Sequence, residues 1–263
     1  VDISGYYEGR EDEARELFRH HLIVVDPVDP GRNAAASVRL EKMALFMAAA
    51  REFLRRPSEV FFFPPEAGSP DPEVLKADIQ GRGTSLLALH IRIDRMAPDV
   101  LWGQIYRTLG ALRGLLKSFG FKVLRASAWS DEEANCVFLL ELEEAHLPPV
   151  MRRVGPPVWL EEHVERFLGK NTGSPEVVCG PYVEGDRWVI LVRRKWPDAV
   201  ALLRDRLADG GRQVGVAPLL AEHVRESLRI LLDEEVISLC GELRGFGRFL
   251  QGFLRGRPSW LAR

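Results

Sequence analysis

The most constraining stretch of this sequence is Asp-Pro-Val-Asp-Pro-Gly at 26–31, which directly follows the apolar run 22–25. Each proline ring forces the residue before it into an extended conformation, so the two Asp-Pro pairs end a strand that the apolar run begins. Gly31 can adopt a positive φ and turn the chain, and Arg32 and Asn33 then lead into an alanine-rich segment. The pattern predicts a strand-to-helix corner that presents a guanidinium and an amide to a ligand.

A long amphipathic helix is predicted after the corner. Apolar residues recur at three- and four-residue spacing over 38–54 with charged residues between them, which indicates a helix over roughly 36–56. Pro57 ends this helix, and the composition of 60–63 predicts a short strand before a linker rich in Pro, Gly and Ser. The chain begins with Val1, only about twenty residues before the corner, and we expect it to be the C-terminal fragment of a longer protein.

The middle of the chain alternates between the periodicities of strands and helices. Strands are predicted at 86–93, 121–128, 137–142 and 188–192, and helices at 98–120 and 158–169. The resulting β-α-β-β-α-β order is the plan of ferredoxin-like and RNA-recognition-motif domains, and the predicted fold class is α+β. The strand at 137–142 carries one aromatic residue where an RNA-recognition motif needs several. RNA binding by this domain would therefore rely on shape and phosphate contacts.

The C-terminal part of the chain reads as helical. Helices are predicted at 199–208 and 218–232, and a weaker packed helix at 239–253. The predicted domains are thus 1–66 with the corner, a linker over 67–83, the ferredoxin-like domain over 84–196, and a C-terminal helical region over 197–263. Residues 241–263 hold five arginines against one acid, Glu242, so the local charge becomes positive.

Charge and cysteine content exclude several classes of protein. A net charge of −2 does not suit a chain that binds nucleic acid over its whole surface, so any RNA site must be a local patch. The three cysteines lack the spacing of a zinc site or a disulfide framework. No apolar run approaches the roughly 18 residues of a membrane span. We expect a cytoplasmic protein with no membrane partner.

The segment Val-Val-Asp-Pro-Val-Asp-Pro-Gly-Arg-Asn-Ala-Ala-Ala at 24–36, followed by a helix, resembles the archaeal CCA-adding enzymes, the class I tRNA nucleotidyltransferases. The resemblance implies that 1–66 is the end of the neck domain of such an enzyme. It also implies that Arg32 and Asn33 face the nucleotide pocket, where Arg32 would read the edge of the incoming C or A base. The parent enzyme would add C, C and A to tRNA 3′ ends by nucleotidyl transfer from CTP and ATP, with Mg²⁺.

The catalytic groups of that family are not found in this sequence. Nucleotidyl transfer with two metal ions needs a Gly-Ser turn and an Asp-x-Asp pair to hold the metals. Arg82-Gly83-Thr84 matches part of the motif, but Asp94 stands alone and the sequence contains no Asp-x-Asp pair. We therefore predict that this chain holds no catalytic residue, metal site or cofactor, and that it adds no nucleotides alone.

The resemblance also implies that the rest of the chain holds the acceptor stem and T-arm of tRNA. Three basic clusters are the candidates for phosphate contacts: Arg152 with Arg153, Lys170, and Arg193 with Arg194 and Lys195. The Arg-Arg-x-Gly-Pro segment at 152–156 resembles the Arg-Arg-Met-Gly-Pro stretch of the family.

A protein of another class fits the same sequence. The alternative is a ferredoxin-like interaction or dimerisation module without RNA affinity, in which the corner at Asp26 is merely structural. If another domain normally covers 25–36, its absence would expose apolar surface and favour a homodimer. A hydrolase is disfavoured because no Ser-His-Asp or Cys-His-Asn grouping can be identified.

Overall fold

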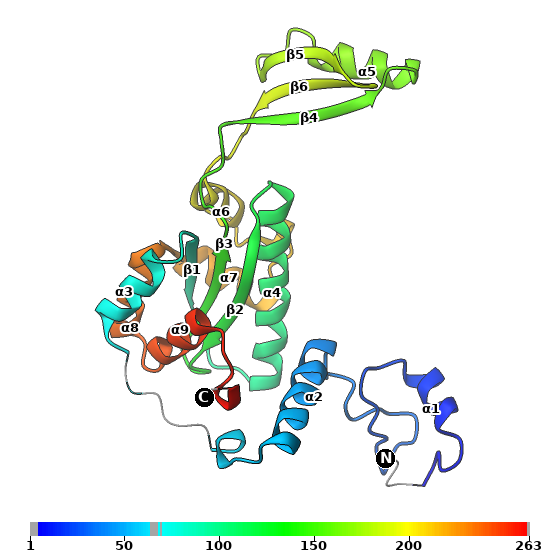
Figure 1. The fold of residues 1–263 in the computed structure, drawn as a ribbon, viewed down its shortest axis with the longest axis vertical. Helices are drawn as coiled ribbons and strands as arrows, with labels where there is room; N and C mark the ends of the chain where they lie inside the picture. The colour runs from blue at the N-terminus through cyan, green and yellow to red at the C-terminus, as the bar shows by residue number, and fades with distance from the viewer. Residues whose placement is uncertain (1–4, 64–67, 69, 262–263) are drawn as a thin grey trace. The chain divides into compact units, whose positions relative to one another are not determined.

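The computed structural model describes residues 5–63, 68 and 70–261. It has mixed helices and antiparallel sheets, so the predicted α+β class is confirmed. The chain divides into two compact units: a first unit of residues 1–66 and 257–263, and a second unit of residues 67–256 (Figure 1).

The first unit holds the helices α1 (Glu11–Phe18) and α2 (Leu40–Arg55) and the short 3-10 helices η1 (Glu59–Phe61) and η4 (Ser259–Leu261). The helix predicted at 36–56 is confirmed as α2, although 36–39 form a turn before it. None of the described residues of α2 is buried, so its apolar side chains do not pack into a core as expected. The ring of Phe61 stacks on Trp260 with centroids 5.8 Å apart, which ties η1 to η4.

Two short strands predicted for the first unit are wrong. The run 22–25 forms only an isolated bridge, in which Val25 pairs with Asn33 of the same loop. The apolar run pairs with a residue of its own loop, and among the described residues this bridge is not extended into a pair of strands. Residues 60–61 belong to η1 instead and 62–63 form a turn after it; Ser58 caps η1 by accepting from the N–H of Val60.

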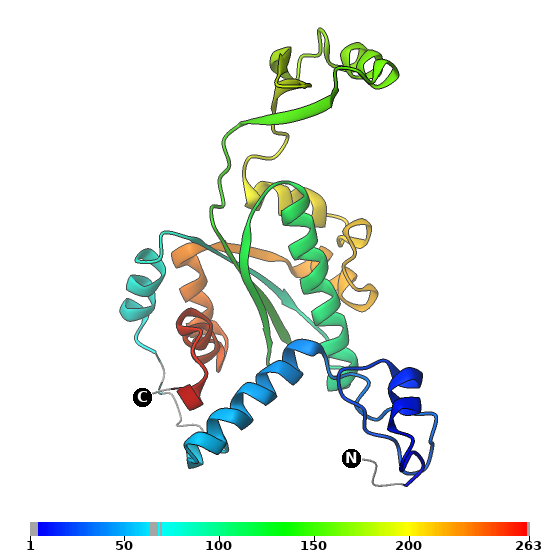
Figure 2. The ribbon, with the colours of Figure 1, turned by 45° about the vertical axis from the view of Figure 1, so that its right-hand side comes forward.

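The second unit is built on a four-stranded antiparallel sheet. Its strands are β1 (Ser85–Arg92), β2 (Val123–Ser130), β3 (Asn135–Leu142) and β7 (Arg229–Leu232), in the order β2-β3-β1-β7. Helices α4 (Pro98–Ser118), α6 (Ala199–Leu207) and α7 (Pro218–Ser227) pack on one face. The other face is covered by α3 (Pro72–Gln80), the 3-10 helix η3 (Asp233–Ile237), α8 (Ser238–Glu242) and α9 (Phe246–Arg255) (Figures 1 and 2).

Alternation along β1 separates the two cores of this unit. Leu87, Leu89 and Ile91 join the core under α4, whereas Leu86 and Ala88 join the core under α3, α8 and α9. Successive side chains of a strand point to opposite faces, so a strand buried on both sides reads as a continuous apolar run. Six consecutive buried residues of β1 show that pattern.

A second, three-stranded antiparallel sheet is formed by residues between β3 and α6. It comprises β4 (Val150–Pro157), β5 (Val177–Glu184) and β6 (Arg187–Arg193) in the order β4-β6-β5, with α5 (Glu161–Asn171) packed on it. The predicted ferredoxin-like domain over 84–196 is therefore not confirmed: α5 and β6, which the prediction assigned to its sheet, belong to this separate sheet. The fourth strand of the first sheet is β7, which lies within the helix predicted at 218–232.

A buried carboxylate joins three parts of the second unit. Glu141 on β3 is 3% exposed, and it accepts hydrogen bonds from Arg82 Nε at 2.7 Å, Arg125 Nη2 at 2.6 Å and Thr84 Oγ1 at 2.8 Å. The two arginines also donate to the last carbonyls of α9, Arg82 to Leu254 at 3.0 Å and Arg125 to Phe253 at 2.7 Å. The carboxylate thus orients two guanidinium groups that satisfy the end of α9.

The hydrogen bonds determine the charge of this carboxylate. Burial alone would raise the pKa of Glu141, but the hydrogen bonds from Arg82, Arg125 and Thr84 outweigh burial and hold the pKa at about 2. Because the folded pKa lies below the ordinary 4.5, the ionised group stabilises the fold fully above about pH 5, and this contribution is lost as the pH falls toward 2.

We predict that Glu141→Gln lowers the free energy of unfolding by about 3 kcal/mol at pH 7, since it leaves two half-buried guanidinium groups without their carboxylate. Urea unfolding from pH 7 to pH 2 measures the difference from the wild type, which should shrink as the pH falls. Glu143→Gln is the control, because Glu143 pairs with Lys122 at 3.1 Å on the exposed surface. A difference that stays constant with pH would contradict the role of Glu141.

Candidate nucleic-acid interface

The Asp-Pro corner at 26–33 is a closed loop tied to the start of the chain. The bridge between Val25 and Asn33 closes its base. The Tyr7 hydroxyl donates to the Pro30 carbonyl at 3.0 Å, which fixes the far side of the loop. The corner therefore has a defined shape instead of being an extended connection.

The amide of Asn33 holds this shape from inside. Asn33 is 7% exposed; its Oδ1 accepts from the N–H groups of Val24 at 2.9 Å and Ala35 at 3.0 Å, and its Nδ2 donates to the Leu22 carbonyl at 2.9 Å. Buried polar groups are normally satisfied in this way. The structure therefore gives Asn33 a positioning role in the corner, and direct contact with a nucleotide base stays a prediction.

Arg32 lies differently, with its guanidinium toward solvent. Its side chain is 70% exposed, and its Nη1 is 3.5 Å from Oδ2 of Asp26. The other oxygen of Asp26 accepts from the N–H of Val28 at 2.9 Å, so the carboxylate is fixed by the loop. Arg32 thus keeps donors that can reach a base edge or a phosphate.

The three-stranded sheet has one face that α5 does not cover. Gly155 lies against the Phe167 ring of α5, and a Cβ on Gly155 would be 2.7 Å from that ring. Val154, the preceding residue, therefore points to the opposite face. Register places six residues of β4 and β6 on this face, which we call the open face: Val150, Arg152, Val154, Val189, Leu191 and Arg193, of which Val189 is buried.

Two of the predicted basic residues meet on the open face. Arg152 lies opposite Leu191 and Arg193 opposite Val150, so the two arginines are diagonal neighbours on adjacent strands. Arg152 Nη2 is 2.8 Å from Oε1 of Glu184. Within the described part of the chain, Arg193 has no ion-pair partner. The open face therefore carries a net positive charge beside exposed apolar side chains.

The remaining candidates lie elsewhere. Arg153 points to the face that bears α5, and Lys170 lies in the last turn of α5. Arg194 Nη1 donates to the carbonyl of Phe119 at 3.2 Å, and Lys195 Nζ lies 4.1 Å from the ring centroid of Trp196. Arg194 and Lys195 thus brace the connection between β6 and α6, and the cluster 193–195 does not act as one surface.

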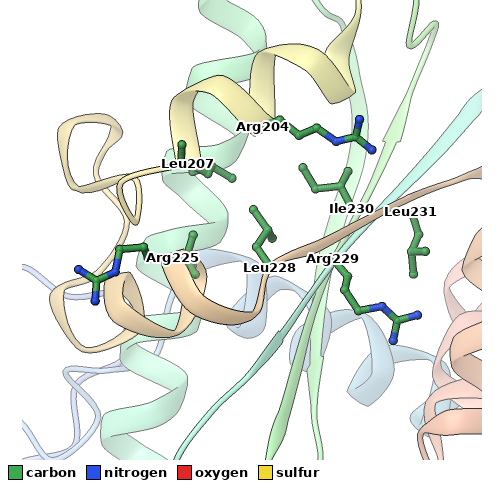
Figure 3. A pocket seen from close by; sticks show the side chains of 9 residues that line it. Arg204, Leu207, Arg225, Leu228, Arg229, Ile230 and Leu231 are labelled. Carbon is green, nitrogen blue, oxygen red and sulfur yellow. The ribbon is translucent and has the colours of Figure 1, made fainter.

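A hollow of about 450 Å³ beside the edge strand β7 is lined by three arginines that the sequence did not single out: Arg204, Arg225 and Arg229. Figure 3 shows that Leu207, Leu228 and Ile230 point into the hollow while the guanidinium groups point away from it. Arg225 pairs with Glu222, and Arg229 Nη1 is 2.5 Å from Glu242. Two of the three guanidinium groups around the hollow are therefore already paired with carboxylates.

Sequence analysis also missed an exposed aromatic residue next to the second sheet. Trp159, in the turn between β4 and α5, is 63% exposed and lies between the exposed Val158 and Leu160. An exposed tryptophan can stack on an unpaired base. The Pro-Pro pair at 156–157 is the sequence feature that could have predicted this exposure, because it ends the strand and brings the next residues into a turn.

The described residues offer neither a metal site nor a membrane-spanning helix. Over 5–63, 68 and 70–261, no group of three His, Cys, Asp or Glu side chains is arranged to hold a metal ion. Over the same residues, no helix is both long and apolar enough to cross a membrane.

Comparison with known proteins gives matches over both units. Residues 82–233 match the family model described as CCA-adding enzyme, C-terminal domain. Residues 2–63 match the model described as tRNA nucleotidyltransferase, second domain. Residues 234–263, which include most of η3 and all of α8, α9 and η4, lie outside both matches.

Curated relatives carry the same description. The CCA-adding enzyme of Methanosarcina acetivorans is 38% identical over 195 residues, which cover 73% of this chain and 42% of that protein. That of Methanosarcina mazei is 40% identical over 197 residues, with 73% and 42% covered. That of Methanothermobacter thermautotrophicus is 34% identical over 260 residues, with 97% and 52% covered. The chain spans about half the length of the curated relatives it matches.

We predict that Asn33→Ala destabilises the corner by about 2 kcal/mol, because it leaves two buried backbone N–H groups without an acceptor. Amide hydrogen exchange measures this directly: the protection of the Val24 and Ala35 amides should fall. Arg32→Ala is the matched control, and its exposed side chain should change protection by less than about 0.5 kcal/mol. Unchanged protection in Asn33→Ala would show that the amide does not hold the corner.

Proposed function

The chain belongs to the CCA-adding enzyme family, and we propose that within such an enzyme it holds tRNA by the acceptor stem and T-arm. The parent enzyme would add C, C and A to the tRNA 3′ end from CTP and ATP with Mg²⁺. The observation that supports tRNA binding most is the open face of the three-stranded sheet, where Arg152 and Arg193 are exposed diagonal neighbours.

The chemistry of the open face suits a sugar-phosphate backbone. Guanidinium groups bind phosphate oxygens in two-pronged geometry, and phosphate contacts supply most of the affinity of such complexes. Recognition of duplex RNA by its shape relies on contacts to phosphates and 2′-hydroxyls and needs no stacking aromatic side chain. Arg153 and Lys170, on the α5 side, would extend the contact only if the RNA wraps around the edge of β4.

The corner would serve the nucleotide in the complete enzyme. Arg32 keeps a solvent-facing guanidinium on a loop fixed by Asn33 and Tyr7, so its donors are positioned before any ligand arrives. We propose that Arg32 meets the base edge of the incoming C or A, and that Asn33 acts by shaping the loop.

An interaction module without RNA affinity is the competing function. The exposed apolar side chains of α2, among them Leu45, Phe46 and Met47, are the observation that favours association with another protein surface. Salt separates the two functions, because phosphate binding weakens steeply with ionic strength and apolar association does not.

We predict that this chain binds a minihelix of tRNA acceptor stem and T-arm, with an affinity that falls steeply between about 50 and 200 mM salt. A DNA duplex of equal length should bind more weakly. Arg152→Ala combined with Arg193→Ala should lower the slope of log K against log[salt] by about 2, one unit for each phosphate contact. Titration of a labelled minihelix at several salt concentrations measures both quantities.

Arg113→Ala is the control for that titration, since Arg113 is exposed on α4 and lies outside the second sheet. Its affinity and salt slope should match those of the unmodified chain. Equal affinity for RNA and DNA, or no binding, would reject the proposed function.

We also predict that the chain alone incorporates no CMP or AMP into a tRNA that lacks its 3′ CCA end. Two-metal nucleotidyl transfer needs a carboxylate pair, and the sequence offers no Gly-Ser turn with an Asp-x-Asp pair. Incubation with labelled CTP, ATP and Mg²⁺ tests this, with a full-length CCA-adding enzyme as the positive control. Incorporation above the no-protein blank would contradict the prediction.

A further inference from the structure

The helix α9 carries the strongest unpaired positive charge of the residues beyond the family match. After Glu242 the sequence contains five arginines and no acid. Arg244, Arg248 and Arg255 are all exposed. In the part of the chain that the structure describes, none of the three has an ion-pair or hydrogen-bond partner for its side chain. We call these three residues the arginine stripe.

Helical geometry places two of the three arginines on one side of α9, and Arg244 lies just before the helix. Arg248 and Arg255 are seven residues apart, which corresponds to about two turns and about 10 Å along the same face. The opposite side of α9 is buried: Phe246, Leu250 and Leu254 pack into the core under the four-stranded sheet. Burial of the apolar side therefore fixes the orientation of α9 and keeps its charged face toward solvent.

The stripe is flat and open between its arginines. Gly252 lies on the exposed face between Arg248 and Arg255, and a Cβ built on it would have no atom within 4 Å. Gly245, between Arg244 and Arg248, is equally open. With no side chain at these positions, a phosphate backbone can approach the helix closely.

A groove begins where the stripe begins. It has a volume of about 600 Å³ and is lined by Arg244 and Arg248 together with Pro70, Pro72 and Ser238. Such a volume is within the range of sites that hold a nucleotide-sized group. The groove therefore combines two unpaired guanidinium groups with space for a phosphate and its sugar.

The position of the arginines in the helix points to an anion as the partner. Arg248 lies in the first turn of α9, where the helix dipole disfavours positive charge. This turn contains no acidic residue and no side-chain cap. By contrast, Arg225 and Arg229 of the same unit are paired with carboxylates. A bound phosphate would neutralise both the arginines and the helix terminus.

We propose that the arginine stripe on α9 is a second contact surface for the sugar-phosphate backbone of RNA, in addition to the open face of the three-stranded sheet. This proposal rests on the proposed tRNA-binding function. An acidic protein segment would compete for the same arginines, whereas the open glycines at 245 and 252 favour the close approach of a sugar-phosphate backbone.

The test introduces a negative charge into the stripe without disturbing the fold. Gly252→Glu places a carboxylate between Arg248 and Arg255 in open space, and a side chain other than Gly at this helical position favours the helix. Gly252→Gln is the neutral variant of the same size. Gly114→Glu is the matched control on α4, on the other face of the sheet, where a Cβ also meets no atom within 4 Å.

The labelled acceptor-stem and T-arm minihelix is titrated onto each full-length variant at low and high salt, after thermal unfolding has confirmed equal stability. Gly252→Glu should bind at least about fivefold more weakly than Gly252→Gln at low salt, with the gap closing at high salt as the charge is screened. Gly114→Glu should bind like the unmodified chain. Arg244→Ala with Arg248→Ala should lower the salt slope by about 2.

The outcomes separate the two proposals. If Gly252→Glu binds as tightly as Gly252→Gln while the Arg152 and Arg193 variant is weakened, the stripe proposal is overturned and the proposed function stands. If the unmodified chain does not bind the minihelix, both are overturned. If Gly114→Glu weakens binding as much as Gly252→Glu, the effect is one of net charge and the stripe proposal is overturned.

Discussion

The hydrogen-bonded charge cluster around Glu141 is the interaction on which the second unit depends. It joins β3 to Arg82, which follows α3, and to Arg125 on β2, and through them to the end of α9. A single buried carboxylate with two guanidinium partners would be costly to assemble if any group were missing. Thr84 and the two carbonyls at the end of α9 complete the hydrogen bonds of the cluster. The cluster therefore fixes β2, β3, the segment after α3 and the end of α9 relative to one another.

That fixed position of α9 has consequences for charge. With Phe246 and Leu250 buried below and its end held by Arg82 and Arg125, α9 can present only its arginine face to solvent. On the three-stranded sheet, the packing of α5 against Gly155 has the same effect, since it leaves the opposite face of β4 uncovered. In both places the core decides which basic residues are available for a ligand.

In the corner of the first unit, local hydrogen bonding likewise decides which side chain is available for a ligand. The side-chain amide of Asn33 forms hydrogen bonds with the backbone of Val24, Ala35 and Leu22, whereas the guanidinium of the neighbouring Arg32 faces solvent. Two adjacent polar residues that look equivalent in sequence therefore differ in role. The loop between them and Asp26 is rigid because its polar groups are satisfied internally.

The sequence by itself determined the elements whose periodicity is strong, such as β1, α2 and α4, and the corner motif by which the family could be identified. It did not reveal that β6 and β7 belong to different sheets, because Leu228 to Leu232 continue the apolar pattern of α7. Nor did it show which arginines are free: Arg82 meets Glu141 from 59 residues away, while Arg248 meets no carboxylate of the residues that the structure describes. Strand pairing and ion pairing join residues that are distant in sequence, and only the tertiary structure brings them together.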